Sequence, residues 1–422
     1  MMFAHCDINS FYCSCESAFN PRLQGLPIVV LANNDHIVIS RSKEAKALGI
    51  KMGALYFENA NFFKKNNVQV FSSNYTLYQD VSDRTMSVLS TFADVMEVYS
   101  IDEAFLIVPE SKRLGGYEEF GRAIQKDILQ IAHVPIGVGF GPTKTLAKLA
   151  NHAAKRWSKT GGVVELSQKT RQRKLMSLLP VDEIWGVGRR ISAKLRMMGI
   201  NTALELADAN IATIRKTFGV VVERTVRELN GESCIEIEEV RKVKEQIISS
   251  KSFGKKVQCY DEMHQAICSY AERASEKLRA EKQLCGVVSV FLGTSHYSPG
   301  PLYSNRATER LVYASADTRD IINAAVKAQG AIWREGYQYH RAGVMLSDFS
   351  GSNVTQFDLF STAKPFKRSE ELMALLDNMN RSGKFNIGFA GKGCDPSWGM
   401  TRGMLSPEYT TNVNDLPIAK VR

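Results

Sequence analysis

Residues 95–108 read VMEVYSIDEAFLIV. Two runs rich in β-forming residues, 95–99 and 104–108, flank a short turn at the spacing of a β-hairpin. Asp102 and Glu103 are adjacent at this turn, between apolar strands. Because neighbouring carboxylates repel each other and are costly to desolvate unless a cation neutralises them, the turn is a candidate metal site. The alternative is a solvated hairpin turn.

The surrounding sequence predicts the rest of a sheet. Segment 2–7 reads as a short strand that ends on Asp7, and strands and helices alternate up to residue 157, which describes an α+β domain. If the first strand joins the hairpin, then Asp7, Asp102 and Glu103 meet at one sheet edge. Mg²⁺ prefers a few carboxylates together with water and substrate phosphates. Two such ions, ~3.5–4 Å apart, clamp the attacking and leaving oxygens in phosphoryl transfer.

Composition sets the class of protein. The chain has 422 residues, 44% hydrophobic and 23% charged, which suggests about three globular domains and excludes a collagen, a disordered tail protein and a long coiled coil. The net charge of +10 points to an anionic partner, most often nucleic acid, although solubility charge is the simpler reading. No apolar run approaches the ~18 residues of a membrane span, and the start lacks the pattern of a secretory signal.

Cysteine usage fits the same class. The eight cysteines include no CxxC pair, so a structural zinc site is not expected. Reduced packing cysteines are the better reading. We therefore expect a cytoplasmic protein with no membrane partner.

Two basic segments are candidates for binding phosphates. Residues 139–148 predict a strand, a glycine turn and a basic helix, in which Lys144, Lys148 and then Lys155 are not accompanied by any acid from 140 to 160. The alternative is a solvated basic face. Residues 184–200 read as a helix-hairpin-helix, whose glycines let backbone amides approach a DNA phosphate. Its candidate DNA-binding residues are Gly186, Gly188, Arg189, Arg190 and Lys194.

The last part of the chain has a different pattern. Strands and helices from 246 to 347 follow in the order βαββαβ, which is the split βαβ pattern, and a loosely patterned tail comes after residue 350. Within the tail, residues 356–360 read Gln-Phe-Asp-Leu-Phe. Exposed apolar clusters in polar segments usually mark a partner site. The alternative is that these aromatics fold back onto their own domain.

Three motifs occur together in the right order. They are Cys-Asp-Ile-Asn-Ser-Phe-Tyr at 6–12, Ser-Ile-Asp-Glu-Ala at 100–104 and GVGFGPTKTLAKLAN at 137–151. With the helix-hairpin-helix, they resemble the Y-family DNA polymerases, and most closely the UmuC branch of bacterial SOS mutagenesis. The resemblance covers essentially the whole chain. It implies a right-hand polymerase with a split-βαβ little finger, which copies DNA past damage with low fidelity.

The resemblance also implies a role for individual residues. Asp7, Asp102 and Glu103, with the main-chain carbonyl of Ile8, match the ligands of two Mg²⁺ ions. Tyr12 matches the steric gate against ribonucleotides, and Phe11 precedes it as in relatives. Ser40, Lys46 and Lys155 match residues that contact the incoming triphosphate.

The implied domains are a palm (1–19 and 76–165), fingers (20–75), a thumb (166–240), a little finger (245–350) and a tail (351–422). The implied partners are primer–template DNA, a dNTP, a UmuD-type accessory dimer and a RecA filament. The tail segment resembles the motif by which bacterial polymerases bind the sliding clamp, with Gln356 as a hydrogen-bonding residue and Leu359 and Phe360 as apolar anchors.

Three positions depart from the family pattern. Lys43 replaces a phosphate-contacting tyrosine, Lys46 replaces an arginine, and His36 stands where relatives have glycine. A lysine lacks the bidentate fork of arginine, so triphosphate positioning is expected to differ. Two other classes stay open from the residues alone. One is a non-catalytic DNA-binding scaffold, and the other is a two-metal nuclease or nucleotide cyclase on a similar palm.

Overall fold

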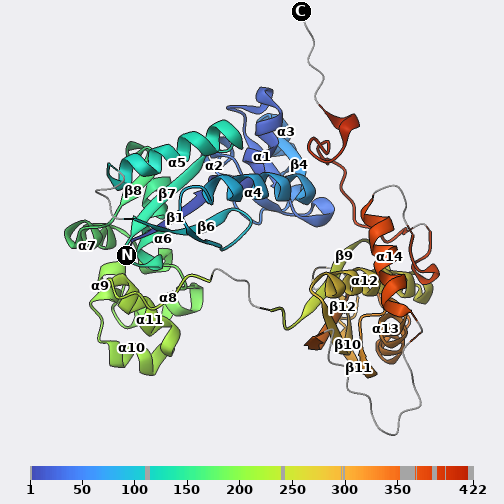
Figure 1. Cartoon of the computed structure of the whole chain (residues 1–422). Helices are drawn as coiled ribbons and strands as arrows, with labels where there is room; N and C mark the ends of the chain where they lie inside the picture. Colours follow the sequence, from blue (N-terminus) through green and yellow to red (C-terminus); the bar gives the residue numbers. More distant parts are fainter. Residues whose placement is uncertain are drawn as a thin grey trace, which may run out of the picture. The chain divides into compact units, whose positions relative to one another are not determined.

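The computed structural model describes residues 2–109, 115–238, 243–295, 297, 300–351, 366, 368–382, 387–394 and 396–416. The chain forms two compact units (Figure 1). The first unit comprises Met1–Ala32, His36–Arg241 and Met404–Arg422, and the second comprises Asn33–Asp35 and Lys242–Gly403.

A five-stranded sheet, in the order β5-β6-β1-β7-β8, lies at the centre of the first unit. The predicted hairpin is confirmed, since Val95 pairs with Ile107 in antiparallel register. Strands β1, β6 and β7 are almost entirely buried, as is typical of strands that are covered on both faces. The strand bounds are β1 Met2–Ile8, β5 Val95–Val98, β6 Glu103–Val108, β7 Ile136–Gly141 and β8 Val163–Glu165.

Four helices accompany this sheet. They are α1 Phe11–Phe19, α4 Tyr75–Leu89, α5 Tyr117–Ile131 and α6 Lys144–Arg156. Helix α6 packs on β1 and β7, and α1 contacts α4. Together with the sheet they enclose a core that includes Phe11, Tyr78 and Phe140.

A smaller sheet, in the order β3-β2-β4, belongs to the same unit. Its strands are β2 Ile28–Leu31, β3 Val38–Arg41 and β4 Gln69–Ser72, with helices α2 Lys43–Ala47 and α3 Tyr56–Lys65. Phe63 of α3 packs with Val29 and Leu31.

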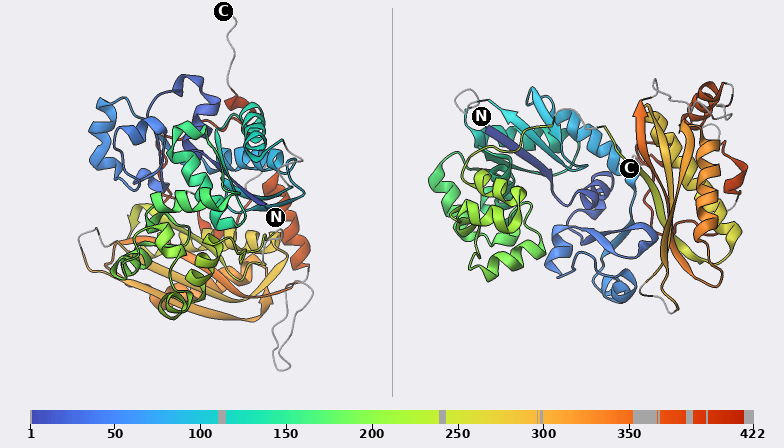
Figure 2. Two further views of the ribbon diagram at one scale, coloured as in Figure 1. Left: turned by 90° about the vertical axis from the view of Figure 1, so that its left-hand side faces the viewer. Right: turned by 90° about the horizontal axis from the view of Figure 1, so that it is seen from below.

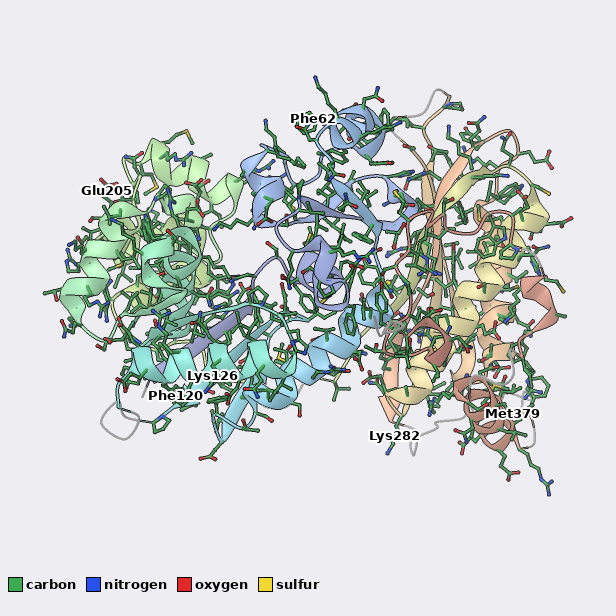
Figure 3. All side chains as sticks on the ribbon, turned by 90° about the horizontal axis from the view of Figure 1, so that it is seen from above. Phe62, Phe120, Lys126, Glu205, Lys282 and Met379 are labelled. Carbon is green, nitrogen blue, oxygen red and sulfur yellow. The ribbon has the colours of Figure 1, made fainter. Side chains whose placement is uncertain are left out.

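The predicted helical segment follows the large sheet. It contains α7 Lys169–Leu178, α8 Arg189–Met197, α9 Ala203–Ala207, α10 Ile211–Phe218 and α11 Val220–Leu229. Helix α9 starts with a capping box, in which the Thr202 side chain accepts from the Glu205 amide and the Glu205 carboxylate (labelled in Figure 3) accepts from the Thr202 amide. These local signals explain why the segment could be predicted as helical.

The second unit has the predicted βαββαβ order. Its sheet runs β11-β10-β12-β9, and helices α12 and α13 pack on each other and on the sheet (Figure 2). The bounds are β9 Ile247–Val257, α12 Tyr260–Ala280, β10 Gln283–Thr294, β11 Ser304–Ser315, α13 Thr318–Ile332 and β12 Tyr339–Gly351.

The tail has more structure than its sequence pattern indicated. Helix α14, Ser369–Arg381, belongs to the second unit, whereas residues 404–416 belong to the first. Gln356, Leu359 and Phe360, predicted to bind the sliding clamp, lie outside the described residues.

Two further sequence expectations can be compared with the fold. All eight cysteines are free thiols, but Cys259 and Cys394 are exposed, so the expected packing role is wrong for these two. None of the helices in the described residues is long and apolar enough to cross a membrane.

Candidate active site

Backbone pairing brings the three acidic residues to one end of the large sheet. Asp7 on β1 pairs with Glu103 on β6, and on its other side with Gly137 on β7. The Ile8 amide donates a hydrogen bond of 3.0 Å to the carbonyl oxygen of Asp102. The predicted convergence of Asp7, Asp102 and Glu103 is therefore a direct consequence of strand register.

The side chains of these acids have different partners. Asp7 forms an ion pair with Lys155, and the Glu103 carboxylate accepts from the Lys148 ammonium at 2.9 Å. The Ser100 hydroxyl donates to the Asp102 carboxylate at 2.6 Å. In the described part of the chain, no three His, Cys, Asp or Glu side chains are arranged as a ready metal-binding group.

The pKa values of the two paired acids, Asp7 and Glu103, are shifted in opposite directions. Burial raises the pKa of Asp7 to about 6, against the opposing effect of Lys155. Burial also acts to raise the pKa of Glu103, but His5 and Lys148 outweigh it and hold that pKa at about 2. Asp102 and Glu103 both raise the pKa of Asp7 through charge repulsion. Hard oxygen ligands that repel each other and now rely on lysines for compensation suit a divalent cation.

Close packing of α6 on β7 positions the lysines. A Cβ atom at Gly139 would lie 2.2 Å from the Asn151 backbone nitrogen, so only glycine allows this approach. The side-chain amide of Asn151 donates to the carbonyl oxygens of His5 and Gly137, at 2.8 and 2.7 Å. This tie fixes the face of α6 that carries Lys148 and Lys155 over the sheet end.

The structure corrects the prediction for the first lysine of this helix. Lys144 is buried, forms an ion pair with Glu97 and donates to the carbonyl oxygen of Glu236 at 2.7 Å, so it can neither meet a phosphate nor belong to a solvated face. Lys148 is held by Glu103 and lies 4.4 Å from the centre of the Tyr99 ring. It therefore orients Glu103.

A cavity of about 350 Å³ opens beside the acids. Every predicted substrate-contacting residue lines it, together with three of the four predicted metal ligands: Asp7, Ile8, Phe11, Tyr12, Ser40, Lys46, Asp102 and Lys155. Glu103 instead lines an adjoining cavity of about 260 Å³, which shares Asp7 and Lys155 with the first. The two cavities meet at the Asp7–Lys155 pair.

The Tyr12 ring forms one wall of the first cavity. It stacks on Tyr78 with a centroid distance of 4.5 Å and an interplanar angle of 16°, and it meets the edge of Tyr75 at 6.0 Å. Half-burial raises the pKa of the Tyr12 phenol. A ring held by two aromatic neighbours presents a fixed surface to a ligand.

Two polar residues of this cavity were not predicted from the sequence. Arg41, at the end of β3, lines the cavity and donates to the carbonyl oxygen of Ile50 at 2.5 Å. Ser10 lines it too and accepts from Lys46 at 3.1 Å. Burial, with Arg41 and Lys155 nearby, lowers the pKa of Lys46, which indicates a locally cationic environment. Lys43 is exposed and is not among the lining residues.

The helix-hairpin-helix occurs where it was predicted. Gly186 has a φ of 86°, which requires glycine, and Gly188 precedes the first turn of α8. Arg189 and Arg190 are exposed at that helix start. Lys194 is also exposed but already contacts its own segment, 5.3 Å from the centre of the Phe218 ring.

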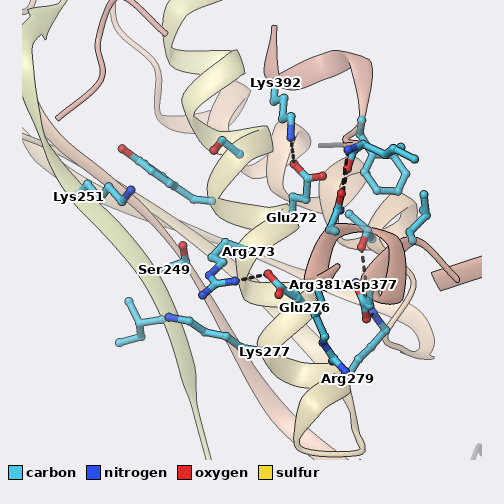
Figure 4. A pocket seen from close by; sticks show the side chains of 18 of the residues that line it. Ser249, Lys251, Glu272, Arg273, Glu276, Lys277, Arg279, Asp377, Arg381 and Lys392 are labelled. Carbon is cyan, nitrogen blue, oxygen red and sulfur yellow. Dashed lines mark hydrogen bonds and ion pairs between the residues drawn. The ribbon is translucent and has the colours of Figure 1, made fainter. Parts of the chain in front are cut away.

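The second unit has a larger polar cavity of about 570 Å³ (Figure 4). Arg279 of α12 forms two hydrogen bonds, at 2.8 and 2.7 Å, with Asp377 of α14 and thereby anchors that helix. A second ion pair, Lys392 with Glu272 at 3.2 Å, holds the segment that follows α14. This cavity lies outside the unit that contains the acidic residues.

Comparison with known proteins shows the family of this chain. The model of the impB/mucB/samB family matches residues 6–152, and that of its C-terminal domain matches 244–359. "Protein UmuC" from Salmonella typhimurium is 51% identical over 98% of this chain and 99% of its own, and "Protein SamB" from Salmonella typhimurium is 52% identical over the full length of both. The chain belongs to the impB/mucB/samB family.

Other matches agree with membership of the impB/mucB/samB family. The helix-hairpin-helix motif of the family matches residues 169–200, which confirms that prediction. "DNA polymerase IV" from Pelotomaculum thermopropionicum is 28% identical over 90% of this chain and 92% of its own. Residues 370–419 match a domain of unknown function.

Solved structures confirm the predicted fold class. A Y-family DNA polymerase chimera, Dbh-Dpo4(243-245)-Dbh, has a TM-score of 0.64 at 22% identity and covers 82% of this chain and 99% of its own. "Insertion ternary complex of Dbh DNA polymerase" has a TM-score of 0.57 at 21% identity over 82% and 98% of the two chains. This impB/mucB/samB chain has the Y-family polymerase fold.

Proposed function

We propose that this chain, a DNA-directed DNA polymerase of translesion synthesis in SOS mutagenesis, joins nucleotides at the sheet edge formed by Asp7, Asp102 and Glu103. The observation that carries the proposal is the cavity in which two of these acids, the Tyr12 ring and two lysines meet. Such a cavity suits an anionic ligand, because the two lysines can neutralise its charge. The flat Tyr12 ring can contact a ligand group of the size of a sugar. A scaffold without catalysis would not need acids and cations at the same cavity.

A divalent metal is the cofactor expected for this fold. We propose specifically that the chain binds two Mg²⁺ ions. Asp7, Asp102 and Glu103 would hold them, with the carbonyl oxygen of Ile8 as a further ligand. When bound, such ions activate the primer 3′-hydroxyl and neutralise the charge that develops on the pyrophosphate. The repulsion among the three acids supports this assignment.

The chain's own residues then bind and orient the nucleotide. Lys46 and Lys155 would neutralise the triphosphate, and Ser40 would hydrogen-bond to it, while Arg41 adds a planar cation at the same wall. Phe11 is buried and contacts the Tyr12 ring, with a centroid distance of 5.5 Å, so it would help to hold that ring in place. Tyr12 would exclude a ribose 2′-hydroxyl by steric clash.

The domain boundaries also stay a proposal. We infer a palm at 1–19 and 76–165, fingers at 20–75, a thumb at 166–240, a little finger at 245–350 and a tail at 351–422. The positions of the five-stranded sheet, the three-stranded sheet, the helical segment and the four-stranded sheet support this division.

The partners of the reaction would be primer–template DNA and a dNTP, assisted by a UmuD-type dimer and a RecA filament. The test is primer extension opposite an abasic site with Mg²⁺ and dNTPs, with and without those accessory proteins. We expect a lengthened primer that depends on a template. Degradation of the primer, or formation of a cyclic nucleotide, would favour the nuclease or cyclase, and duplex binding without any product would favour the scaffold.

Arg189 and Arg190 are expected to bind the DNA backbone through the helix-hairpin-helix. Replacing both by alanine should weaken duplex binding equally for all sequences. Since each phosphate contact contributes roughly 0.9 to the slope of log affinity against log salt, that slope should fall by about 2. Arg173→Ala, which removes a cation already paired with Asp208, is the matched control. An unchanged slope in the double variant would place the DNA elsewhere.

The segment with Gln356, Leu359 and Phe360 is expected to bind the sliding clamp, on its sequence pattern alone. Leu359→Ala combined with Phe360→Ala should abolish clamp binding and clamp-stimulated synthesis, because both apolar anchors are lost. Basal extension of a short primer should persist. Phe357→Ala, at a position of the segment to which no clamp contact is assigned, is the control, and the prediction fails if the double variant retains its clamp affinity.

A further inference from the structure

The segment 404–409 lies within the match to the domain of unknown function and belongs to the first unit, which contains the acidic residues. The Met404 amide donates to the Ser72 hydroxyl at 3.0 Å, and the Ser72 amide donates to the Met404 carbonyl oxygen at 2.9 Å. Tyr409 stacks on Phe19 of α1, with a centroid distance of 5.2 Å and an interplanar angle of 6°. A segment more than 300 positions away in the sequence thus covers α1 and the end of β4.

Ser406 connects this segment to buried polar groups. The Asn74 side chain, which caps α4 by accepting from the Leu77 amide, donates to the Ser406 hydroxyl at 3.0 Å. The Ser406 hydroxyl donates in turn to the Glu16 carboxyl group at 3.1 Å. Glu16 and Asn74 are only 1% and 2% exposed, so water cannot substitute for these partners.

The same carboxyl group holds the ring on which Tyr12 stacks. The Tyr78 hydroxyl donates to the Glu16 oxygen at 2.6 Å, and Tyr78 is fully buried. An unbroken chain of contacts therefore runs from Ser406 through Glu16 and Tyr78 to Tyr12. Asn74 and Tyr78 both belong to the start of α4, which also carries Tyr75 at the edge of Tyr12.

We propose that Ser406 and Glu16 are positioning residues, which fix the Tyr12 ring through Tyr78 and thereby set the discrimination between deoxyribose and ribose. The proposal rests on the role of Tyr12 under the proposed function. It assigns a function to part of the domain of unknown function, because residues 404–409 supply the hydrogen bond that holds Glu16, and Glu16 holds Tyr78. Ser406 does not line that cavity, so it acts only through its neighbours.

Glutamine is a suitable conservative replacement at position 16. Burial raises the pKa of the Glu16 carboxyl group to about 7, even though Tyr78 and Ser406 donate to it. A neutral amide oxygen of the same shape can accept from both hydroxyl groups. Glu16→Gln should therefore preserve the support, whereas alanine removes the shared acceptor.

The experiment measures kcat and KM for single insertion of a dNTP and of the matching rNTP by the full-length chain. Ser406→Ala and Tyr78→Phe each remove one buried hydroxyl and leave its neighbours in place. Loss of one buried hydrogen bond is expected to reduce sugar selectivity about 5- to 20-fold, through better rNTP insertion. Insertion of dNTP should stay within about twofold of wild type, and so should the selectivity of Glu16→Gln. Ser90→Ala, an exposed serine on the end of α4, is the matched control.

Tyr12→Ala serves as the reference variant. If it loses selectivity while Ser406→Ala and Tyr78→Phe keep that of wild type, Ser406 and Glu16 do not position Tyr12, although Tyr12 itself discriminates between the sugars. A parallel fall of dNTP and rNTP insertion in those two variants would also overturn the proposal, because it would show only a weakened fold. Unchanged selectivity in Tyr12→Ala itself would overturn both the role of Tyr12 in sugar discrimination and the positioning role of Ser406 and Glu16.

Discussion

Alanine in place of Asp102 or of Glu103 should slow nucleotide addition by about 10³-fold or more, because a lost metal ligand removes several kcal/mol of transition-state stabilisation. Duplex affinity should persist, since phosphate binding depends on lysines and arginines elsewhere. Asp102 and Glu103 occupy the turn of the β5–β6 hairpin, where strand register brings them to Asp7. The measurement is single-turnover primer extension at saturating dNTP and Mg²⁺.

A nearby acid provides the control for this pair. Asp94 is exposed just before β5, so Asp94→Ala changes the same net charge without touching the cavity. Its extension rate should equal that of wild type. Near-normal extension by both the Asp102 and the Glu103 variants would remove these acids from the catalytic site.

Tyr12→Ala should admit ribonucleotides. The 2′-hydroxyl is the only group that distinguishes the two sugars, and the Tyr12 ring is held in place by Tyr78 and Tyr75. We expect sugar selectivity to fall by about 100-fold or more, equivalent to about 3 kcal/mol. Competition between a dNTP and its matching rNTP on one template measures this directly.

The size of the residue, rather than its hydroxyl group, should matter at this position. Tyr12→Phe keeps the ring and its stacking on Tyr78, so it should stay close to wild-type selectivity. If Tyr12→Ala discriminated between the sugars as well as wild type, another residue of the cavity would have to form the gate.

The sequence predicted the parts of the fold that local patterns determine. The β5–β6 hairpin, β7 and the basic helix α6 follow from β-formers, glycines and helical spacing within short windows. The start of β11 carries little sequence signal, because Ser304, Asn305, Arg306 and Thr308 are polar and exposed, yet this segment pairs with β10. Edge positions of a sheet need little apolar pattern.

Long-range contacts explain the other failures. Lys144 looks like a surface lysine in sequence, but Glu97 and the Glu236 carbonyl oxygen make its burial tolerable. Arg41 escaped notice because only the folded β3 brings it to the cavity. Ser406 bonds to Asn74 across 332 positions, and an irregular segment carries no periodic signal that predicts such a contact.

Under the proposed function, Asp7, Asp102 and Glu103 bind the divalent cations of nucleotidyl transfer. The most direct test is anomalous X-ray scattering from Mn²⁺ in crystals of the full chain with primer–template DNA and a non-hydrolysable dNTP. We predict manganese peaks within about 2.0–2.4 Å of these three carboxylates, with Lys148 and Lys155 displaced from them. Manganese density elsewhere, with Asp7 still paired to Lys155 and Glu103 to Lys148, would contradict the account.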